Sequence, residues 1–340
     1  MKVLFFSVKK FEKIPIKHSN NYGFQISMKE ERLTLETAFL AKGFNTICIF
    51  TTDDASKDVL KILYSLGIQY ITIRATGYNN IDLAFAHEMG IKVANVPDYS
   101  PHAVAEHAIM LMLSLARKSK IAQQQIQRQD FSVDKLIGSN INNKTIGIIG
   151  TGKIGAVVAK ILFGFGVKIL AHDLNTNEEL KNSYHVKYVS LDNLCKNSNF
   201  ITLHMPLNKS TAYMINDTLI KKMKKGVIII NTARGGIVNT KELIANLKNK
   251  KLGGYAMDVY EKEEDVFFID HSQSKVKDNM LLELMSFDNV FITPHQAFAT
   301  VEAINNIAEI TFNNIKSWYL NQELKNEIKF DIKKMALESL

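Results

Sequence analysis

Short runs of apolar and β-branched residues alternate along the chain with longer amphipathic stretches. In the first hundred residues this pattern predicts strands at residues 3–8, 46–50, 69–73 and 92–96, and helices at residues 27–40, 54–66 and 81–89. Further along it predicts strands at residues 145–149, 167–172, 199–204, 227–231, 253–258 and 289–293. Strands that alternate with helices favour parallel sheets covered on both faces. The expected fold class is therefore α/β, with two doubly wound parallel-sheet domains.

Three stretches depart from this simple alternation. Residues 102–117 are apolar around nearly the whole helix circumference, which predicts burial between domains or between subunits. We interpret His107, inside this helix, as a hydrogen-bonded core residue rather than a ligand. Residues 118–143 are polar and rich in glutamine, which predicts a surface helix followed by a loop. Residues 297–326 predict a long helix that returns to the first domain, because a C-terminal helix needs an apolar face to pack on.

A glycine-rich turn follows the strand predicted at residues 145–149. Its G-x-G-x-x-G spacing is formed by Gly150, Thr151, Gly152, Lys153, Ile154 and Gly155. The first glycine permits a tight turn, the second lets the backbone approach a pyrophosphate, and the third lets a helix pack close to the strand. Asp173 ends the next strand, where a carboxylate can bind the ribose hydroxyls of NAD. The sequence therefore predicts a Rossmann domain that binds NAD.

The position of this turn, late in the chain, also predicts the domain organisation. Residues 100–296 form the expected NAD-binding Rossmann domain. Residues 1–99 contain no dinucleotide motif, and together with residues 297–340 they form the expected flavodoxin-like substrate domain.

Composition and charge narrow the classes of partner. The formal net charge is +8, but the lysines are dispersed and gather at helix C-termini, where they complement the helix dipole. Since the chain has no aromatic interleaving and no zinc spacing, we expect no nucleic-acid partner and no metal. No apolar run approaches the roughly 18–20 residues needed to span a membrane, so no membrane association is expected. The two cysteines, Cys48 and Cys195, predict reduced thiols in a cytoplasmic protein.

Chemically useful residues follow the strands predicted in the second half. Open α/β sheets bind ligands outside the carboxyl ends of their strands. An arginine fork can bind a carboxylate, and a histidine can exchange a proton with an alcohol or ketone while a neighbouring carboxylate stabilises the imidazolium. Arg234, Glu263 and His295 together therefore predict hydride transfer between a nicotinamide and a 2-keto acid. Taken singly, each has a structural alternative: a surface ion pair, a loop position or the end of a strand.

Five segments resemble the D-2-hydroxyacid dehydrogenase family over essentially the whole chain. They are Arg-Ala-Thr-Gly-Tyr-Asn-Asn-Ile-Asp at 74–82, Asn-Val-Pro-Asp-Tyr-Ser-Pro-His-Ala-Val-Ala-Glu-His at 95–107, Asn-Thr-Ala-Arg-Gly-Gly-Ile-Val at 231–238, Met-Asp-Val-Tyr-Glu-Lys-Glu at 257–263 and Thr-Pro-His-Gln-Ala-Phe at 293–298. The resemblance implies that His295 is the acid/base, that Glu263 is its partner, and that Arg234 orients a 2-keto acid substrate.

The same resemblance implies roles for further residues. The backbone near Thr76 and Gly77 would hold the substrate carboxylate, and Asp258 would bind the nicotinamide amide. The remaining residues implied near the cofactor are His204, Pro206, Thr232, Ala233 and Arg234. Tyr99 and Phe298 would line the substrate pocket.

Within the family, the chain resembles the D-lactate dehydrogenase branch. Tyr99, Phe298 and the long loop at residues 264–287 carry this resemblance, and no proline follows Glu263, which is a feature of the branch. The implied activity is reversible, NADH-dependent reduction of pyruvate to D-lactate. The implied assembly is a homodimer or a dimer of dimers that buries the helix at residues 102–117. Asn239 stands where the family usually has aspartate.

Two other functions remain open. A D-2-hydroxyacid dehydrogenase for a larger 2-keto acid, of the isocaproate or phenylpyruvate type, would use the same chemistry; the bulky Tyr99 and Phe298 favour a small pocket instead. A dinucleotide-sensing binding module would share the fold, but such proteins carry interaction tails. A formate dehydrogenase is disfavoured, because in that branch a glutamine takes the place of Glu263.

Overall fold

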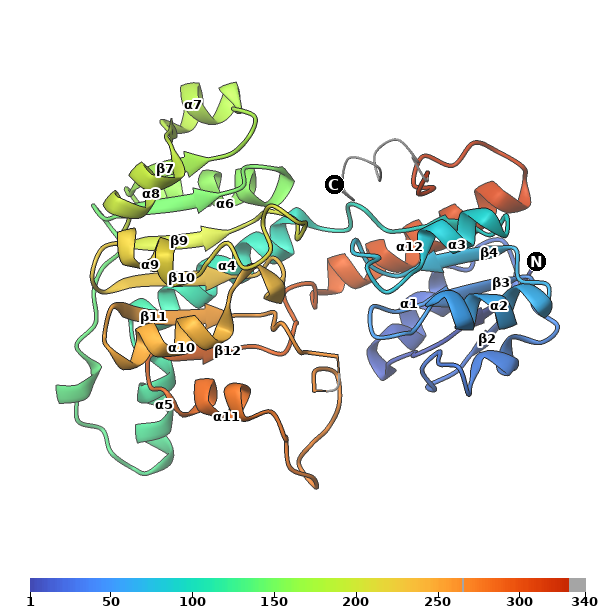
Figure 1. The fold of residues 1–340 in the computed structure, drawn as a ribbon, viewed down its shortest axis with the longest axis horizontal. Coiled ribbons are helices and arrows are strands. Elements are labelled where there is room, and N and C mark those ends of the chain that lie inside the picture. Colours follow the sequence, from blue (N-terminus) through green and yellow to red (C-terminus); the bar gives the residue numbers. More distant parts are fainter. Residues whose placement is uncertain (265, 330–340) are drawn as a thin grey trace. The chain divides into compact units, whose positions relative to one another are not determined.

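The computed structural model describes residues 1–264 and 266–329, and their contacts divide the chain into two compact units (Figure 1). The first unit contains Met1–Ser100 and the chain from Ala299 onward, and the second contains Pro101–Phe298. Each unit is built around a single sheet in which all paired strands are parallel. The expected α/β fold class is confirmed.

The sheet of the first unit has the strand order β2-β1-β3-β4-β5. Its strands are β1 (Lys2–Phe5), β2 (Gln25–Met28), β3 (Thr46–Ile49), β4 (Tyr70–Ile73) and β5 (Lys92–Ala94). This is the flavodoxin-like order, in which the chain first moves to one edge of the sheet and then crosses to the other.

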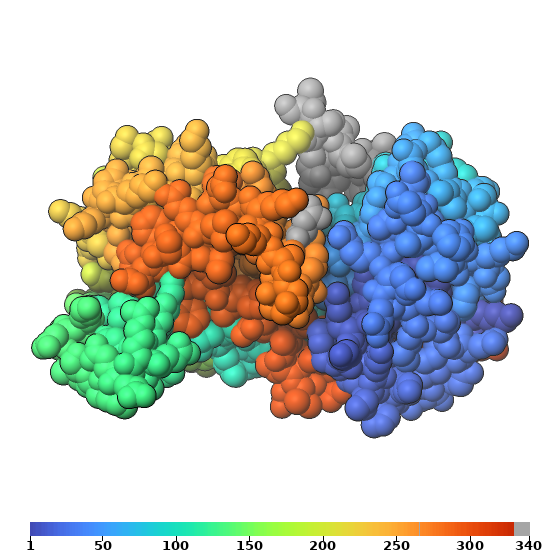
Figure 2. Space-filling view, turned by 90° about the horizontal axis from the view of Figure 1, so that it is seen from below, coloured from blue at the N-terminus to red at the C-terminus, as the bar shows by residue number. Residues whose placement is uncertain are grey.

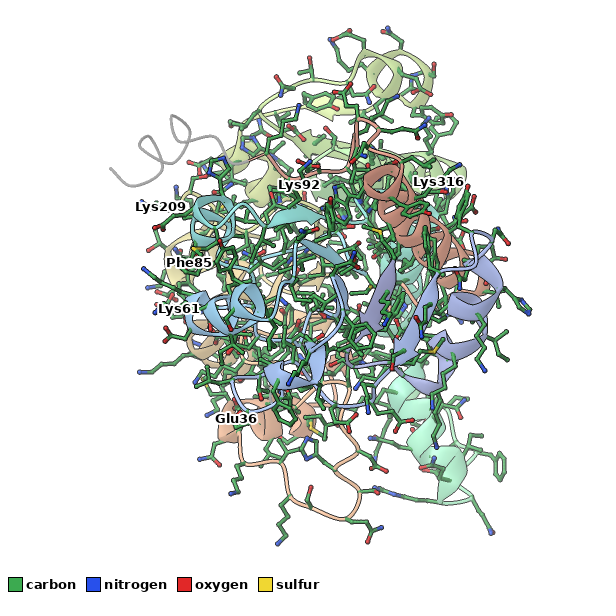
Figure 3. All side chains as sticks on the ribbon, turned by 90° about the vertical axis from the view of Figure 1, so that its right-hand side faces the viewer. Glu36, Lys61, Phe85, Lys92, Lys209 and Lys316 are labelled. Carbon is green, nitrogen blue, oxygen red and sulfur yellow. The ribbon has the colours of Figure 1, made fainter. Side chains whose placement is uncertain are left out.

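Helices cover both faces of this first sheet. They are α1 (Lys13–Ser19), α2 (Lys57–Ser65), α3 (Leu83–Glu88) and α12 (Val301–Tyr319), with 3-10 helices η1 (Lys10–Glu12) and η2 (Ala38–Ala41). Alternate residues of β1 point to opposite faces, as the period of a strand requires: Leu4 joins the core under α2 and α3, whereas Val3 and Phe5 join the core under α1 and α12. Lys316, labelled on α12 in Figure 3, lies with its Nζ 4.5 Å from the ring centroid of Tyr22.

The helix expected at residues 27–40 is wrong. The segment instead contains the end of β2, an irregular stretch and η2. Local side chains compete for the backbone here, since Thr37 Oγ1 accepts a hydrogen bond from Thr34 N at 2.8 Å. The buried Asp53 carboxylate also accepts from Leu33 N at 2.8 Å, which fixes an extended path that periodicity does not encode.

The second sheet has the order β12-β11-β10-β9-β6-β7-β8. Its strands are β6 (Thr145–Ile149), β7 (Lys168–His172), β8 (Lys187–Tyr188), β9 (Phe200–Leu203), β10 (Val227–Asn231), β11 (Leu252–Met257) and β12 (Val290–Ile292). Counted from β6, this is the Rossmann order with β12 added at one edge. The direction of winding reverses where β6 lies beside β9, and a ligand crevice is expected at that point.

The helices of the second unit form two apolar cores, one on each face of its sheet. They are α4 (Pro101–Ala116), α5 (Ser119–Gln127), α6 (Lys153–Gly164), α7 (Glu178–Tyr184), α8 (Leu191–Asn197), α9 (Asp217–Lys222), α10 (Thr240–Lys248) and α11 (Asn279–Ser286), with 3-10 helices η3 (Asp134–Leu136) and η4 (Gly235–Ile237).

The uniformly apolar helix α4 is buried inside the second unit itself. Ile109, Leu111 and Met112 share one core with α6 and with strands of the same sheet. Met110 is the exposed large apolar residue of this helix, at 37%. The expectation that the Leu, Ile and Met side chains of this helix bury against a second copy is therefore wrong for the three buried residues Ile109, Leu111 and Met112, because their own unit already covers them. For Met110, Leu113 and Leu115, which are not fully buried in the unit, it stays a prediction.

Candidate active site

The glycine-rich turn has the geometry of a dinucleotide site. Gly150 follows β6 with φ +91°, and Gly152 is the N-cap of α6. A Cβ on Gly150 would lie 2.5 Å from the backbone oxygen of His204, and one on Gly155 would lie 2.0 Å from that of Gly150, so packing requires glycine at both positions. A Cβ on Gly152 would meet no atom within 4 Å. The turn thus leaves open space over the N-terminus of α6, which suits a pyrophosphate.

Asp173, directly after β7, lies beside this turn. Its Oδ2 accepts hydrogen bonds from Thr151 N at 2.5 Å and from Thr151 Oγ1 at 3.1 Å. Burial raises the pKa of Asp173, but hydrogen bonds from Thr151 and Asn175 outweigh that effect and hold the pKa below its ordinary value. The carboxylate is therefore ionised at neutral pH and can accept hydrogen bonds from ribose hydroxyls.

Two buried polar atoms near the neighbouring strand ends have no hydrogen-bond partner in the described part of the chain. They are His204 Nδ1, after β9, and Thr232 Oγ1, after β10. The other ring nitrogen of His204 lies 2.8 Å from Thr202 Oγ1, and burial lowers the pKa of His204 to about 3, so the ring is neutral at physiological pH. A buried polar atom without a partner is costly. The two atoms therefore fit a polar ligand such as the nicotinamide nucleotide.

His295 and Glu263 are brought into direct contact. His295 Nδ1 lies 2.8 Å from Glu263 Oε1, and the other carboxylate oxygen, Oε2, accepts Tyr260 N at 2.9 Å. The carboxylate is thus fixed on both sides and orients the imidazole. In the described residues, His295 Nε2 has no hydrogen-bond partner, which leaves that nitrogen for a reacting oxygen. The backbone of His295 has φ +54°, an unusual conformation for a residue with a side chain.

A buried carboxylate holds the loop that carries His295. Asp258, which is 1% exposed, accepts hydrogen bonds from Thr293 Oγ1 at 2.6 Å, Gln296 N at 2.8 Å and Ala297 N at 2.9 Å. His107 Nε2 lies 2.9 Å from Thr293 Oγ1, which agrees with its interpretation as a hydrogen-bonded core residue. Asp258 therefore anchors the loop on both sides of His295, while its role toward the nicotinamide amide stays a prediction.

Arg234 belongs to the loop after β10. Gly235 packs so tightly that a Cβ would lie 2.0 Å from the Tyr260 backbone, which places this loop against the segment leading to Glu263. Arg234 Nη1 donates to Ala233 O at 2.7 Å, and among the described residues the guanidinium forms no salt bridge. Its charge is therefore available to an anionic ligand.

The remaining predicted site residues lie in the first unit, apart from Pro206 after β9 and Phe298 after the His295 loop. Thr76 and Gly77 follow β4, where Thr76 Oγ1 donates to Val96 O at 2.9 Å. Their backbone N–H groups make no hydrogen bond to any described residue. Tyr99 O accepts Asn306 Nδ2 at 2.8 Å.

A buried ion pair, which the sequence did not predict, anchors the loop that carries Thr76 and Gly77. The guanidinium of Arg74, 2% exposed, donates from Nε to Glu12 Oε1 at 2.8 Å and from Nη2 to Phe6 O at 3.0 Å. Burial lowers the pKa of Arg74, but the attraction and hydrogen bonds of Glu12 and Cys48 together outweigh that effect and hold the pKa above its ordinary value. Because the partners are 62 residues apart in the sequence, no local pattern could have revealed the pair.

Phe268 was also missed by the sequence. Its ring centroid lies 5.7 Å from that of His295, at an interplanar angle of 40°. The contact depends on the path of the loop after Glu263, and no spacing in the sequence signals it.

The described residues contain no group of three side chains suited to a metal ion, and no described helix is long and apolar enough to cross a bilayer. These observations apply to residues 1–264 and 266–329.

Known proteins share the sequence and the fold. Residues 109–297 match the model of the D-isomer specific 2-hydroxyacid dehydrogenase, NAD binding domain. The D-lactate dehydrogenase of Escherichia coli is 40% identical over 329 residues, which cover 96% of this chain and 100% of that enzyme. Its apo structure matches with a TM-score of 0.89 and 38% identity over 97% of this chain and 100% of that chain.

A second solved structure carries both ligands. The D-lactate dehydrogenase of Aquifex aeolicus, complexed with NAD and lactic acid, matches with a TM-score of 0.86 and 33% identity over 97% of this chain and 99% of that chain. The resemblance found in the sequence is thus confirmed at the level of family and fold. The chain belongs to the D-isomer specific 2-hydroxyacid dehydrogenase family, and its second unit carries the NAD binding domain of that family.

Proposed function

We propose that this enzyme catalyses the reversible, NADH-dependent reduction of pyruvate to D-lactate. The observation that carries the proposal is the 2.8 Å contact between His295 Nδ1 and Glu263 Oε1, in the unit that contains the dinucleotide turn. A histidine held by a carboxylate at one ring nitrogen offers the other nitrogen to a reacting oxygen. The E. coli and A. aeolicus relatives are D-lactate dehydrogenases, which supports pyruvate and D-lactate as the substrate pair.

In the reducing direction, His295 supplies the proton. Bound NADH supplies the hydride that reaches the carbonyl carbon. The imidazolium donates its Nε2 proton to the carbonyl oxygen, and Glu263 stabilises the imidazolium before that transfer. Arg234 orients the keto acid by charge-assisted hydrogen bonds to its oxygens. Oxidation of D-lactate uses the same groups with the proton moving back to His295.

We assign residues 1–99 and 297–340 to the substrate and residues 100–296 to NAD. The backbone N–H groups of Thr76 and Gly77 bind the substrate carboxylate, which is supported by their lack of hydrogen-bond partners among the described residues. Tyr99, in the first unit, and Phe298, in the second, are further residues that we propose contact the substrate.

The cofactor contacts that we propose follow the strand ends of the second unit. They are made by Gly150, Thr151, Gly152, Lys153, Ile154, Gly155, Asp173, His204, Pro206, Thr232, Ala233, Arg234 and Asp258. Asp173 favours NAD over NADP, because its charge repels a 2′-phosphate at the ribose. The lowered pKa of Asp173 supports this preference, since the carboxylate stays charged at neutral pH.

We infer that the enzyme is cytoplasmic and forms a homodimer or a dimer of dimers. The two free, buried cysteines support a reducing compartment. The segment at residues 119–139, which we call the arm, supports self-association. Its large apolar side chains are mostly exposed, at 48% for Ile126, 73% for Phe131, 64% for Val133 and 72% for Ile137. A cluster of exposed apolar side chains marks an interaction surface.

The experiment that tests the catalytic proposal is an NADH oxidation assay with a panel of 2-keto acids, followed by chiral analysis of the product. We expect pyruvate to be reduced, and the product to be D-lactate alone. Formation of L-lactate would contradict the proposal. A clear preference for phenylpyruvate or 2-ketoisocaproate would indicate an enzyme for larger substrates, and NADH binding without turnover of any keto acid would indicate a dinucleotide sensor.

A further inference from the structure

The chain turns sharply directly after Glu263. Glu263 O accepts hydrogen bonds from Val266 N at 3.0 Å and from Phe267 N at 2.8 Å. Phe267 is 5% exposed and belongs to the apolar core on one face of the second sheet, so it anchors the turn. Phe268, the next residue, has φ +64°. The turn and the anchor together direct the ring of Phe268 back toward the residue that Glu263 holds.

Three rings meet at that point. The centroid of Phe268 lies 5.7 Å from that of His295 and 6.3 Å from that of Phe298, with interplanar angles of 40° and 46°. Phe268 and His295 both have positive φ, at +64° and +54°. A bulky residue in this conformation is held there by its surroundings, and such strain gathers at functional sites.

The position of the ring limits what can approach His295. In the function proposed above, on which this inference rests, the carbonyl oxygen of the keto acid must come within hydrogen-bonding distance of His295 Nε2. The substituent on the carbonyl carbon is then close to the His295 ring, and the Phe268 ring, whose centroid is 5.7 Å from that of His295, is in a position to contact it. Phenyl rings have two side-chain torsions and little freedom, so they form a firm boundary.

We propose that Phe268 is a specificity-determining residue that, with Phe298, forms an apolar wall beside His295 and limits the substrate to 2-keto acids with a small side chain. The methyl group of pyruvate packs against the wall, whereas a branched or aromatic side chain meets the Phe268 ring. Phe268 also has apolar neighbours in the core of the second unit, so a purely structural role is the competing explanation.

The test compares Phe268→Ala with Ile269→Ala, a matched control at the next residue, whose side chain is 47% exposed. We measure kcat/KM for pyruvate, 2-ketoisocaproate and phenylpyruvate. For each larger acid, Phe268→Ala should raise the ratio of its kcat/KM to that of pyruvate by about tenfold or more. This is the usual effect when a pocket gains room for one or more methylene groups. Phe268→Leu should give an intermediate ratio, and Ile269→Ala should keep that of the wild type.

Additional variants and measurements keep the test decisive. Thermal unfolding and NADH binding report whether each variant is folded. If Phe268→Ala does not fold, Phe268→Trp serves as the test. The larger ring should lower kcat/KM for the larger acids relative to pyruvate, while pyruvate is still reduced. A structural role would change stability and leave these ratios unchanged, and that result overturns the inference. If wild type reduces pyruvate and the kcat/KM ratios of the Phe268 variants equal those of wild type, the apolar wall is overturned and the proposed function stands. If wild type reduces no keto acid, the proposed function is overturned, and the wall with it.

Discussion

At the scale of single residues, the proposed chemistry depends on one hydrogen-bonded pair, Glu263 and His295, and on what holds it. Glu263 is fixed through Oε2 by Tyr260 N, and Oε1 is directed at His295. The carboxylate thereby fixes one ring nitrogen of His295 and leaves the other for a reacting oxygen. Pyruvate reduction should therefore depend on Glu263.

We expect Glu263→Gln to lower kcat/KM for pyruvate by about tenfold or more, because the amide nearly keeps the shape but holds His295 Nδ1 by a weaker, neutral hydrogen bond. His295→Ala should lose more, about 10²-fold or more, because the group that exchanges the proton is removed. Steady-state assays of pyruvate reduction measure both effects, and thermal unfolding shows whether each variant is folded.

Glu261→Gln is the matched control for Glu263→Gln. Glu261 hydrogen bonds to Tyr213, whose pKa it raises, and it does not contact His295 in the described structure. Its kcat/KM for pyruvate should match that of wild type. If Glu261→Gln loses activity and Glu263→Gln keeps it, the partner has been misassigned.

At the scale of elements, the strand–turn–helix unit β6–α6 is set by close packing. Gly155, the third glycine of the turn, lies where the backbones of the helix and the turn touch. The contacting atoms belong to the backbone of Gly150, so moving a side chain would not make room for a Cβ. Gly164, in the last turn of the same helix, has nothing within 4 Å of its ideal Cβ. The two glycines therefore differ in function although they share one helix.

Gly155→Ala should weaken NADH binding by at least about tenfold and lower the melting temperature, because the added carbon would lie 2.0 Å from Gly150 O. Gly164→Ala should bind NADH like wild type and be neutral or more stable by up to about 1 kcal/mol, since alanine favours helix over glycine. Fluorescence titration with NADH and thermal unfolding measure both effects. Equal NADH affinities in the two variants would refute the packing argument.

At the scale of the whole molecule, the arm is a segment of the second unit that carries several exposed large apolar side chains. In Figures 1 and 2 it stands out from the body of the second unit, in teal and green. Lys120 fixes its base, because its Nζ donates to Met285 O, Phe287 O and Val290 O. The base of the arm is therefore fixed to the rest of the unit, while its large apolar side chains are exposed to solvent. Such a surface suits association with a second copy.

Light scattering at micromolar concentration should show a dimer or a larger closed assembly for wild type. The double variant Phe131→Asp, Ile137→Asp should shift it toward monomer, because a closed two-fold interface would bring the added charges into contact with apolar surface. Leu174→Asp, at a leucine that is 97% exposed outside the arm, should leave the assembly unchanged. A monomeric wild type would exclude the proposed assembly.

Much of the fold and part of the site could be predicted because their signals are local. The alternation of strand and helix periods predicted two parallel sheets, and the spacing of Gly150, Gly152 and Gly155 predicted the dinucleotide turn. The segments carrying Arg234, Glu263 and His295 were located because each follows a strand. The helix predicted at residues 27–40 failed for a physical reason: backbone N–H groups of the stretch donate to Thr37 Oγ1 and to the distant Asp53 carboxylate, and these hydrogen bonds overrode its amphipathic pattern.

The sequence by itself determined which segments become strands and helices, because spacing of apolar residues selects the period of the backbone. It also determined which residues stand at strand ends. Only the tertiary structure decided which residues and elements come into contact. It brings Glu263 to His295 and buries Arg74 against Glu12. It also covers α4 with the sheet of its own unit and places the Phe268 ring beside His295. Such contacts depend on strand order, register and loop path, which arise from interactions between residues far apart in the chain.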